Sequence, residues 1–534
     1  MNISPSSHRS ALACHLHPKR DNGGWRLFLA TYHIWLCSGL LVVGVGLRGF
    51  QYSCDRSLWL DEAFVATNLV HKSHGALMHE LTFDQRAPAG FLLVEKSIVD
   101  ALGHSDWALR LFPWLCGLAS LMLFHFLGQR FLPAGAAVLA LALVAFSPAL
   151  IYYAAELKQY STEVVVTLLL LLSADRLRTG DATAIRCAEL ALVGVIGVWF
   201  SFPAPFLLAG VGLCLTSHAM WHKDWPRVLG LAAVGAVWVV SFAALYEVQL
   251  RHFPRNVGLI ALWDDGYMPL PPRSFHDCKW FVARYFGTLR DITGLSTWGL
   301  AGLTFLIGVC TLAQRSRLRL SILLAPIAIA LLVSGLRFYP FQGRLLLYLV
   351  PIVSLLIALG AWRMVEALAT SLPSAAVGLV VLLVGPIVGT AGIQLAKRQP
   401  YTNCLFKGFQ HEDMKPVMAH IKSNWQTDDI VYLYSQSNVA FEHYADRFGF
   451  RSSDAVRGML AEMCLRDWSA VGADLEQLRG RRRVWVLFSH VNSGNGVDED
   501  KLHLYFLDRM GHRLDVYRPD PNCNCVVYLY DLGI

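Results

Sequence analysis

Long apolar runs follow one another along most of this chain, and they limit what it can fold into. About eleven of them have roughly the 17–25 residues that a helix needs to cross the ~30 Å hydrocarbon core of a bilayer. They lie at 27–48, 109–129, 133–151, 161–176, 187–201, 203–219, 226–247, 296–313, 319–336, 344–362 and 374–396. The composition, 55% hydrophobic and 16% charged, is unlike that of a soluble globular domain. The sequence therefore predicts a polytopic α-helical membrane protein, in which Pro203 and Pro205 could merge the runs at 187–201 and 203–219 into one broken helix.

Short basic loops alternate along the chain and indicate its orientation. The segments HPKRDNGGWR, DRLRTGDATAIR, HKDWPR and QRSRLR carry the positive charge that is typical of cytoplasmic loops. Residues 1–26 are therefore predicted to be cytoplasmic, and the first run is predicted to be an uncleaved signal anchor. An odd number of spans then places the loop 49–108 and residues 397–534 outside. This bias accounts for the net charge of +7, and no basic–aromatic array indicates a nucleic-acid partner.

Two regions outside the apolar runs have patterns of their own. In the loop 49–108, DEAFVATNLVHKSHGALMHEL and GFLLVEKSIVDAL have apolar residues at helical spacing, which predicts helices in the plane of the membrane surface. After residue 396, the runs DIVYLYSQ, RRVWVLFSH and CVVYLYDL are β-branched and aromatic, and helical patterns separate them. Residues 397–534 are therefore predicted to form a small α/β domain that follows a membrane domain at 27–396.

Two neighbouring carboxylates stand at the start of the first outer helix, in SLWLDEAFVATNLV (Ser57–Val70). Asp61 could be the N-cap of a helix that begins at Ala63, because Asp is a favoured N-cap. Alternatively, the pair serves a site at the membrane surface. Adjacent helical residues point about 100° apart, so only one of Asp61 and Glu62 can face a given reacting atom, and the other is expected to support it.

A second polar cluster lies in YYAAELKQYSTEV, where the third run meets the fourth. If the helix begins at Glu156, then Glu156, Gln159 and Tyr160 share a face with Glu163, while Lys158 lies nearly opposite Glu156. Ionisable groups at membrane depth usually mark a site or a pair. A lysine that extends to the interface among interfacial tyrosines is the alternative.

A third cluster lies in SGLRFYPFQGRLLLYLVP, on the same outer side. Arg337 and Arg344 stand seven residues apart, with Tyr339 and Gln342 between them. Guanidinium groups bind phosphate well, so the segment could bind a lipid phosphate. Ordinary anchoring at the interface would also explain both arginines. Three polar clusters on one side of the membrane favour a shared site.

These segments, taken in order, resemble a known group of membrane enzymes. LDEAF, QRAPAGFLLVEKSI, ALRLFP, YYAAELKQYSTEV and FQGRLLLYLVP have the order and sidedness of the GT-C superfamily of membrane glycosyltransferases. The likeness is greatest to the bacterial family-39 branch, which includes protein O-mannosyltransferases, the aminoarabinose transferase of lipid A and sugar transferases of lipopolysaccharide cores. It covers residues 27–396, although relatives often have a Pro-Pro-aromatic run where this chain has Pro88 alone.

The resemblance implies roles for the three clusters. The acidic motif of the family falls on Asp61 and Glu62, with Asp61 the expected catalytic base. The remaining site residues implied are Lys158, Tyr160, Arg337 and Arg344 at the donor phosphate, with Glu156, Tyr339 and Gln342 in support.

The implied activity is transfer of a sugar from a polyprenyl-phosphate-linked donor to an acceptor hydroxyl on a glycolipid, polysaccharide or protein. The reaction would be inverting, with Asp61 as general base and basic side chains stabilising the departing phosphate, at the outer face of a bacterial inner membrane. Asp61, Glu62 and Glu156 could also hold a divalent cation, although their spacing identifies no metal. Two other functions stay open: a transporter or flippase of lipid-linked sugars, for which paired broken helices near the midplane are expected, and a non-catalytic scaffold.

Overall fold

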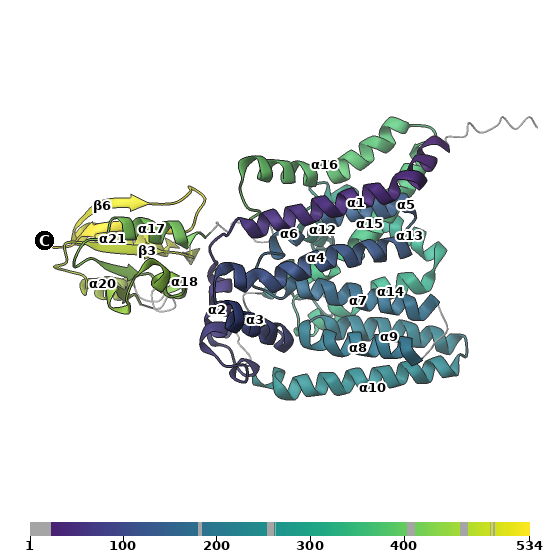
Figure 1. Ribbon diagram of the computed structural model, residues 1–534, viewed down its shortest axis with the longest axis horizontal. Coiled ribbons are helices and arrows are strands. Elements are labelled where there is room, and N and C mark those ends of the chain that lie inside the picture. The colour runs from purple at the N-terminus through teal and green to yellow at the C-terminus, as the bar shows by residue number, and fades with distance from the viewer. Residues whose placement is uncertain are drawn as a thin grey trace, which may run out of the picture.

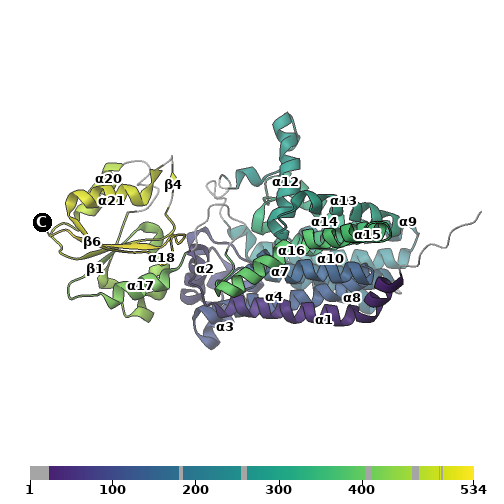
Figure 2. The same ribbon diagram turned by 90° about the horizontal axis from the view of Figure 1, so that it is seen from above.

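A helical bundle, two short platform helices and a smaller α/β domain make up the chain (Figures 1 and 2). The computed structural model describes residues 23–179, 184–253, 261, 263–402, 412–459, 468–491, 493–494 and 497–533. The platform helices α2 (Leu60–His71) and α3 (Ala89–Leu102) lie where the bundle meets the α/β domain. Helices are thus present in the loop 49–108, as its pattern predicts.

The helices of the bundle lie at the predicted apolar runs, apart from one helix at Phe275–Thr293, which lies between two of those runs. In chain order these are α1 (Gly23–Ser53), α4 (Asp106–Phe131), α5 (Ala134–Ala145), α6 (Pro148–Tyr153), α7 (Tyr160–Thr179), α8 (Ala184–Phe200), α9 (Ala204–Trp221), α10 (Trp225–Val248), α12 (Phe275–Thr293), α13 (Trp298–Arg315), α14 (Arg317–Gly335), α15 (Val350–Leu368) and α16 (Pro373–Lys397). Seven of the helices in the described ranges are long and apolar enough to cross a membrane, or eight if α12 and α13, bent by 101° at their junction, form one span. The other predicted runs, at 133–151, 161–176 and 187–201, lie in α5 and α6, in α7 and in α8, which are shorter or carry more charge.

The proline-rich segment between α8 and α9 separates two helices. α8 and α9 pack against each other and both contact α7 and α10, while α9 also packs against α14, so the two helices lie side by side. Pro203 and Pro205 therefore end one pass and begin the next, and the single broken helix is wrong.

The basic loops collect at one end of the bundle. Asp175, near the end of α7, forms ion pairs with Arg178 at 3.0 Å, with Arg319 at 3.2 Å and with Arg130 at 3.7 Å. These arginines come from the ends of α4 and α7 and from the start of α14. At about 1.5 Å per residue, the length of α7 places this end ~30 Å from Tyr160, at the other end of α7. The basic ends of α4 and α7 and the basic start of α14 therefore lie on the same side of the bundle.

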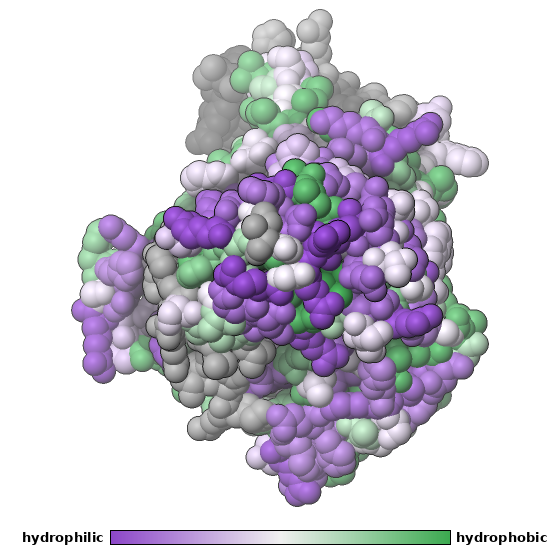
Figure 3. All heavy atoms as spheres, turned by 90° about the vertical axis from the view of Figure 1, so that its left-hand side faces the viewer, coloured by the Kyte–Doolittle hydropathy of each residue, from purple (hydrophilic) through white to green (hydrophobic). Residues whose placement is uncertain are grey.

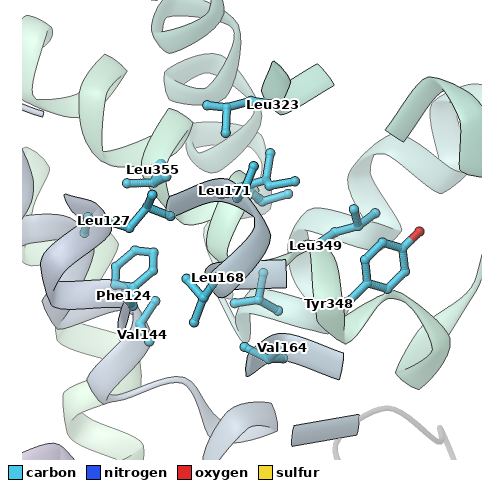
Figure 4. Packing of buried hydrophobic residues seen from close by; sticks show 14 of the residues in the cluster. Phe124, Leu127, Val144, Val164, Leu168, Leu171, Leu323, Tyr348, Leu349 and Leu355 are labelled. Atoms are coloured by element: carbon cyan, nitrogen blue, oxygen red, sulfur yellow. The ribbon is translucent and has the colours of Figure 1, made fainter. Parts of the chain in front are cut away.

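Close helix packing at the centre of the bundle depends on glycine. Figure 4 shows Leu168 and Leu171 of α7 packed among side chains of neighbouring helices. α13 and α15 approach even more closely: a Cβ atom on Gly308 would lie 1.9 Å from the Leu356 carbonyl oxygen, and one on Gly360 would lie 1.8 Å from that of Thr304. Small residues allow such backbone contact between membrane helices.

A five-stranded mixed sheet with helices on both faces forms the C-terminal domain (Figure 2). Its strand order is β2 (Ala455–Arg457), β1 (Ile430–Leu433), β3 (Val484–Phe488), β7 (Val526–Asp531) and β6 (His512–Tyr517), with β1 parallel to β2 and β3 and the other pairs antiparallel. α17 (Met414–Ser423) and α18 (Asn438–Ala445) cover one face, and α20 (Trp468–Glu476) and α21 (Glu499–Met510) cover the other. The three apolar runs predicted as strands are β1, β3 and β7.

The C-terminal domain and the platform share one hydrophobic core. Leu433 and Leu487 from the sheet belong to the same buried cluster as Leu58, Val65 and Leu69 of the platform. The end of the domain that faces away from the bundle is largely hydrophilic (Figure 3). The domain is therefore docked on the platform by apolar burial and presents its polar side to solvent.

We expect Gly360→Leu to destabilise the bundle, because its side chain would meet the backbone of α13. Overpacking is expected to cost about 1–3 kcal/mol, which for a chain of this length corresponds to a fall of roughly 1–3 °C in the unfolding midpoint. The midpoint would be measured by thermal unfolding in detergent. Gly389→Leu on α16 is the matched control, since a Cβ there meets nothing within 4 Å. Equal midpoints for the two variants would contradict the close packing.

Candidate active site

Asp61 lies in the first turn of α2 and faces two basic side chains. α2 begins at Leu60 with Trp59 as its N-cap, so the expectation that Asp61 caps a helix starting at Ala63 is wrong. The Oδ2 atom of Asp61 lies 2.7 Å from a terminal nitrogen of Arg344 and 3.5 Å from Nζ of Lys158. The carboxylate therefore belongs to a charge cluster and does not serve as a helix cap.

Gln85 connects the members of this cluster. Its Nε2 donates to Oδ1 of Asp61 at 3.3 Å, and its Oε1 accepts from Nζ of Lys158 at 2.8 Å. Gln85 belongs to the segment QRAPAGFLL, just before α3, which sequence reasoning did not treat as a source of site residues. An amide with both donor and acceptor capacity can bridge a carboxylate and an ammonium group without adding charge.

Glu62 turns the other way and is buried among arginines. Its Oε1 accepts from Nε of Arg110 at 2.8 Å and from the Leu157 N–H at 2.8 Å, and its Oε2 accepts from Arg110 at 2.7 Å and from Arg56 at 3.1 Å. Burial by itself raises the pKa of Glu62, but Arg110 and Arg56 outweigh it and hold the pKa below its ordinary value. Asp61 thus faces Lys158 and Arg344, while Glu62 points away from them and supports Asp61. This agrees with the angle of about 100° between adjacent residues of a helix.

Arg56 and Arg110 were missed from the sequence, although a signal for Arg110 was present. Arg110 stands in ALRLFP at the start of an apolar run, where a charge is costly unless it is paired. It also donates to the carbonyl oxygens of Arg56 at 2.6 Å and Ser57 at 3.2 Å, and Arg56 donates to that of Ala155 at 2.9 Å. The ion cluster therefore joins the segments on both sides of the site.

The segment that carries Glu156 and Lys158 is not helical. α6 ends at Tyr153 and α7 begins only at Tyr160, so the helical face predicted from Glu156 onward is wrong. The Lys158 N–H instead donates to the Glu156 carbonyl oxygen at 2.7 Å, which closes a tight three-residue turn that a helix does not contain, and the Leu157 N–H donates to Glu62. The resulting turn directs Lys158 to Asp61.

Glu156 is buried beside the ion cluster. Its nearest basic partner is Arg56 at 3.9 Å. Burial, followed by the neighbouring charge of Glu62, raises the pKa of the Glu156 carboxyl above its ordinary value. Tyr160, at the start of α7, packs its ring edge-to-face against Tyr153, with 5.1 Å between ring centroids.

Of the two predicted arginines, the structure brings only Arg344 to Asp61. Arg344 lies in a 3₁₀ helix, η5 (Gly343–Leu349), and its guanidinium lies over the rings of Trp59 at 5.4 Å and Tyr160 at 5.8 Å. Arg337 is exposed and pairs with Asp264 at 2.9 Å. The positive φ of Arg337, 61°, marks the turn that separates the two arginines.

The other two predicted residues flank η5. The Tyr339 hydroxyl donates to the Leu345 carbonyl oxygen at 3.2 Å, and its ring lies 5.4 Å from that of Phe206 on α9. Gln342 immediately precedes η5, and its side chain lies close to Gly266. A Cβ atom added to Gly266 would lie 3.0 Å from Oε1 of Gln342. Both residues shape the segment that carries Arg344.

Comparison of the chain with known proteins finds solved structures that have a similar fold. No family model and no curated protein matches the chain. Among solved structures, the oligosaccharyltransferase AglB from Archaeoglobus fulgidus, in complex with an inhibitory peptide and a dolichol-phosphate, matches with a TM-score of 0.50 and 12% identity, over 94% of this chain and 74% of that chain. ArnT from Cupriavidus metallidurans, bound to undecaprenyl phosphate, matches with a TM-score of 0.49 and 13% identity, over 95% of this chain and 98% of that chain. The chain has a GT-C-like fold.

In this GT-C-like fold the site combines one partly exposed carboxylate with two buried cations. Burial alone would raise the pKa of Asp61, but Lys158 and then Arg344 overcome it, so that the pKa lies well below its ordinary value. Burial lowers the pKa of the Lys158 ammonium, and the charge of Asp61 offsets part of that change. Such a cluster can bind an anion with its cations and accept a proton on its carboxylate.

The acids of this site do not fit a divalent cation. Glu62 uses its oxygens for Arg56, Arg110 and a backbone N–H, and Asp61 faces two positive charges that a metal ion would oppose. Within the described ranges, no group of three or more His, Cys, Asp or Glu side chains is arranged as metal ligands. The chemistry is therefore developed from the side chains themselves.

We expect Glu62→Gln to destabilise the protein, because it leaves Arg56 and Arg110 buried without a full counter-charge. Removing one partner of a buried ion pair costs about 3–5 kcal/mol. The free energy of unfolding in detergent would measure this loss. Glu247→Gln is the matched control, because Glu247 forms an exposed pair with Arg251 at 2.6 Å, for which a change within about 1 kcal/mol is expected. Losses of the same size would show that the buried cluster is not stabilising.

Proposed function

We propose that this protein is a glycosyltransferase that moves a sugar from a polyprenyl-phosphate-linked donor to an acceptor hydroxyl at the outer face of a bacterial inner membrane. The observation that carries the proposal is the Asp61 carboxylate held between Lys158 and Arg344 where the platform meets the bundle. The AglB structure with the similar fold is a complex with a dolichol-phosphate, which is a lipid phosphate of the proposed class. The acceptor hydroxyl belongs to a glycolipid, a polysaccharide or a protein.

Lys158 and Arg344 are suited to the leaving phosphate. Their side chains are 6% and 12% exposed, so their charges act in a site from which most water is excluded. When the bond between the sugar C1 and the phosphate oxygen breaks, its electron pair stays on the phosphate. Positive charge stabilises that oxygen more than a proton would. The Lys158 ammonium and the Arg344 guanidinium supply this positive charge.

Asp61 is suited to the proton of the acceptor. It accepts the hydroxyl proton while the hydroxyl oxygen bonds to C1, which inverts the configuration there. In the absence of donor, Lys158 and Arg344 hold its pKa low and make it a weak base. A donor phosphate would take up part of their charge and add its own negative charge nearby, which raises the pKa of Asp61. The base then becomes effective when the donor is bound.

The placement of the cluster favours an enzyme over a flippase. A transporter of lipid-linked sugars needs its polar groups near the bilayer midplane. Here they lie at the start of α7, in η5 and on the platform, at the end of the bundle opposite the basic loops. This arrangement suits a donor whose tail stays in the bilayer and whose sugar is at the surface.

We expect Asp61→Asn to lower sugar transfer by about 10²-fold or more, the range of a general base, because the amide keeps the shape but is a very poor base. The measurement is transfer of radiolabelled sugar from a polyprenyl-phosphate-sugar pool in membranes, with expression and detergent behaviour as checks of folding. Asp100→Asn is the matched control, since Asp100 is half-exposed on α3 and pairs with Lys96. Transfer that persists unchanged in well-folded Asp61→Asn would refute the assignment of the base.

A further inference from the structure

The C-terminal domain holds the backbone that leads into α2. The Leu58 N–H donates to the Tyr444 hydroxyl at 2.7 Å, and the Leu60 N–H donates to Oε2 of Glu412 at 2.9 Å. The first N–H groups of a helix have no acceptor within the helix, so Glu412 satisfies one that is otherwise unpaired. Leu60 immediately precedes Asp61, and the domain therefore fixes the start of the turn that carries Asp61.

His490 is held by the same carboxylate. Its Nδ1 lies 2.6 Å from Oε1 of Glu412, which is buried, while the imidazole is 26% exposed. Its φ is 52°, in the left-handed region that residues other than glycine rarely adopt, at a cost of order 1–3 kcal/mol. A strained backbone that presents a side chain to a carboxylate is typical of a functional position.

His490 stands at the edge of the sheet where functional side chains collect in α/β domains. It comes two residues after β3, and the carboxyl ends of the parallel strands β1 and β3 share this edge. β7 begins at the same edge, where Sγ of Cys525 donates to the Ser489 hydroxyl at 3.4 Å. This edge meets the platform through Glu412.

The charges around His490 come from both domains. Burial by itself lowers the pKa of the imidazole, but the hydrogen bond and charge of Glu412, followed by the charge of Asp61, raise it above the ordinary value. Cys525 is the titratable group on the adjoining strand. The charge of Asp61 thus acts on His490, while the direct contact of the imidazole is with Glu412.

We propose that His490 and Glu412 form a positioning pair for Asp61, through which the C-terminal domain completes the catalytic site. Glu412 binds the first turn of α2 through the Leu60 N–H and orients the imidazole through Nδ1 of His490. Lys158 and Arg344 restrain the Asp61 side chain from the bundle, and the pair of Glu412 and His490 restrains the start of α2 from the C-terminal domain. This inference rests on the proposed function, because it assigns a role in that reaction.

Two variants of His490 test the pair. We expect His490→Ala to lower kcat for sugar transfer by about 10–100-fold, the effect of a misplaced catalytic group, with the KM for the donor unchanged. His490→Asn should recover most of kcat, because its amide can donate to Glu412 as Nδ1–H does, and Asn tolerates positive φ. A general loss of structure would not be rescued in this way.

The matched control is His420→Ala. His420 forms an imidazole–carboxylate pair of the same kind with Asp515 at 2.9 Å in the same domain. The His420→Ala variant should therefore transfer sugar as the wild type does. Full activity of His490→Ala, in membranes where Asp61→Asn is inactive, would overturn the inference and leave the proposed function intact. A raised acceptor KM with normal kcat would also overturn it and make His490 an acceptor contact. No transfer by the wild type would overturn both.

Hydrogen exchange tests the pair without relying on activity. We expect Glu412→Ala in the full chain to speed amide exchange in the peptide that spans residues 58–66, because the Leu60 N–H loses its acceptor. Exchange in the platform helix α3 is the internal reference. Equal protection of residues 58–66 in the variant and the wild type would overturn the role of Glu412.

Discussion

The buried cluster of Glu62, Arg110 and Arg56 is the interaction on which the rest of the site depends. It joins the start of α2, the start of α4 and the turn before α7 through hydrogen bonds of 2.6–3.2 Å. Each member is buried, and an unpaired charge there would cost several kcal/mol, on the order of 3–5. The three segments therefore have to come together as a set, and this fixes the direction in which Asp61 points.

The second constraint is the seam between the platform and the C-terminal domain. Asp106, at the start of α4, accepts from Tyr444 at 2.9 Å and forms ion pairs with Arg447 at 2.8 Å and Lys415 at 3.0 Å. The apolar cluster shared by the two parts lies beside these contacts. Apolar burial supplies most of the attraction, and the polar contacts set the register of the two parts, because few other arrangements would satisfy buried charges.

Most of the architecture could be predicted from the sequence, because periodicity and length are local signals. The boundaries of α4, α10 and α16 lie within a few residues of the predicted runs, and the three apolar segments near the end are strands. The predicted helix from Glu156 failed because its backbone bonds to Glu62, almost a hundred residues away in the chain. Arg337 and Arg344 are close in sequence, but the turn at Arg337 directs them to different partners, Asp264 and Asp61.

The sequence by itself determined that the chain is a polytopic membrane protein with a platform of helices and an α/β domain, and it singled out Asp61, Lys158 and Arg344 as candidates. Amphipathic and apolar patterns specify these features because each element buries its own apolar face. Only the tertiary structure decided which of the two adjacent acids faces the cations, and that Gln85 bonds to Asp61, Arg110 bonds to Glu62 and Glu412 bonds to the backbone just before Asp61. Those contacts join residues from distant segments, and they form only because buried charges require partners, which no local pattern in the sequence records.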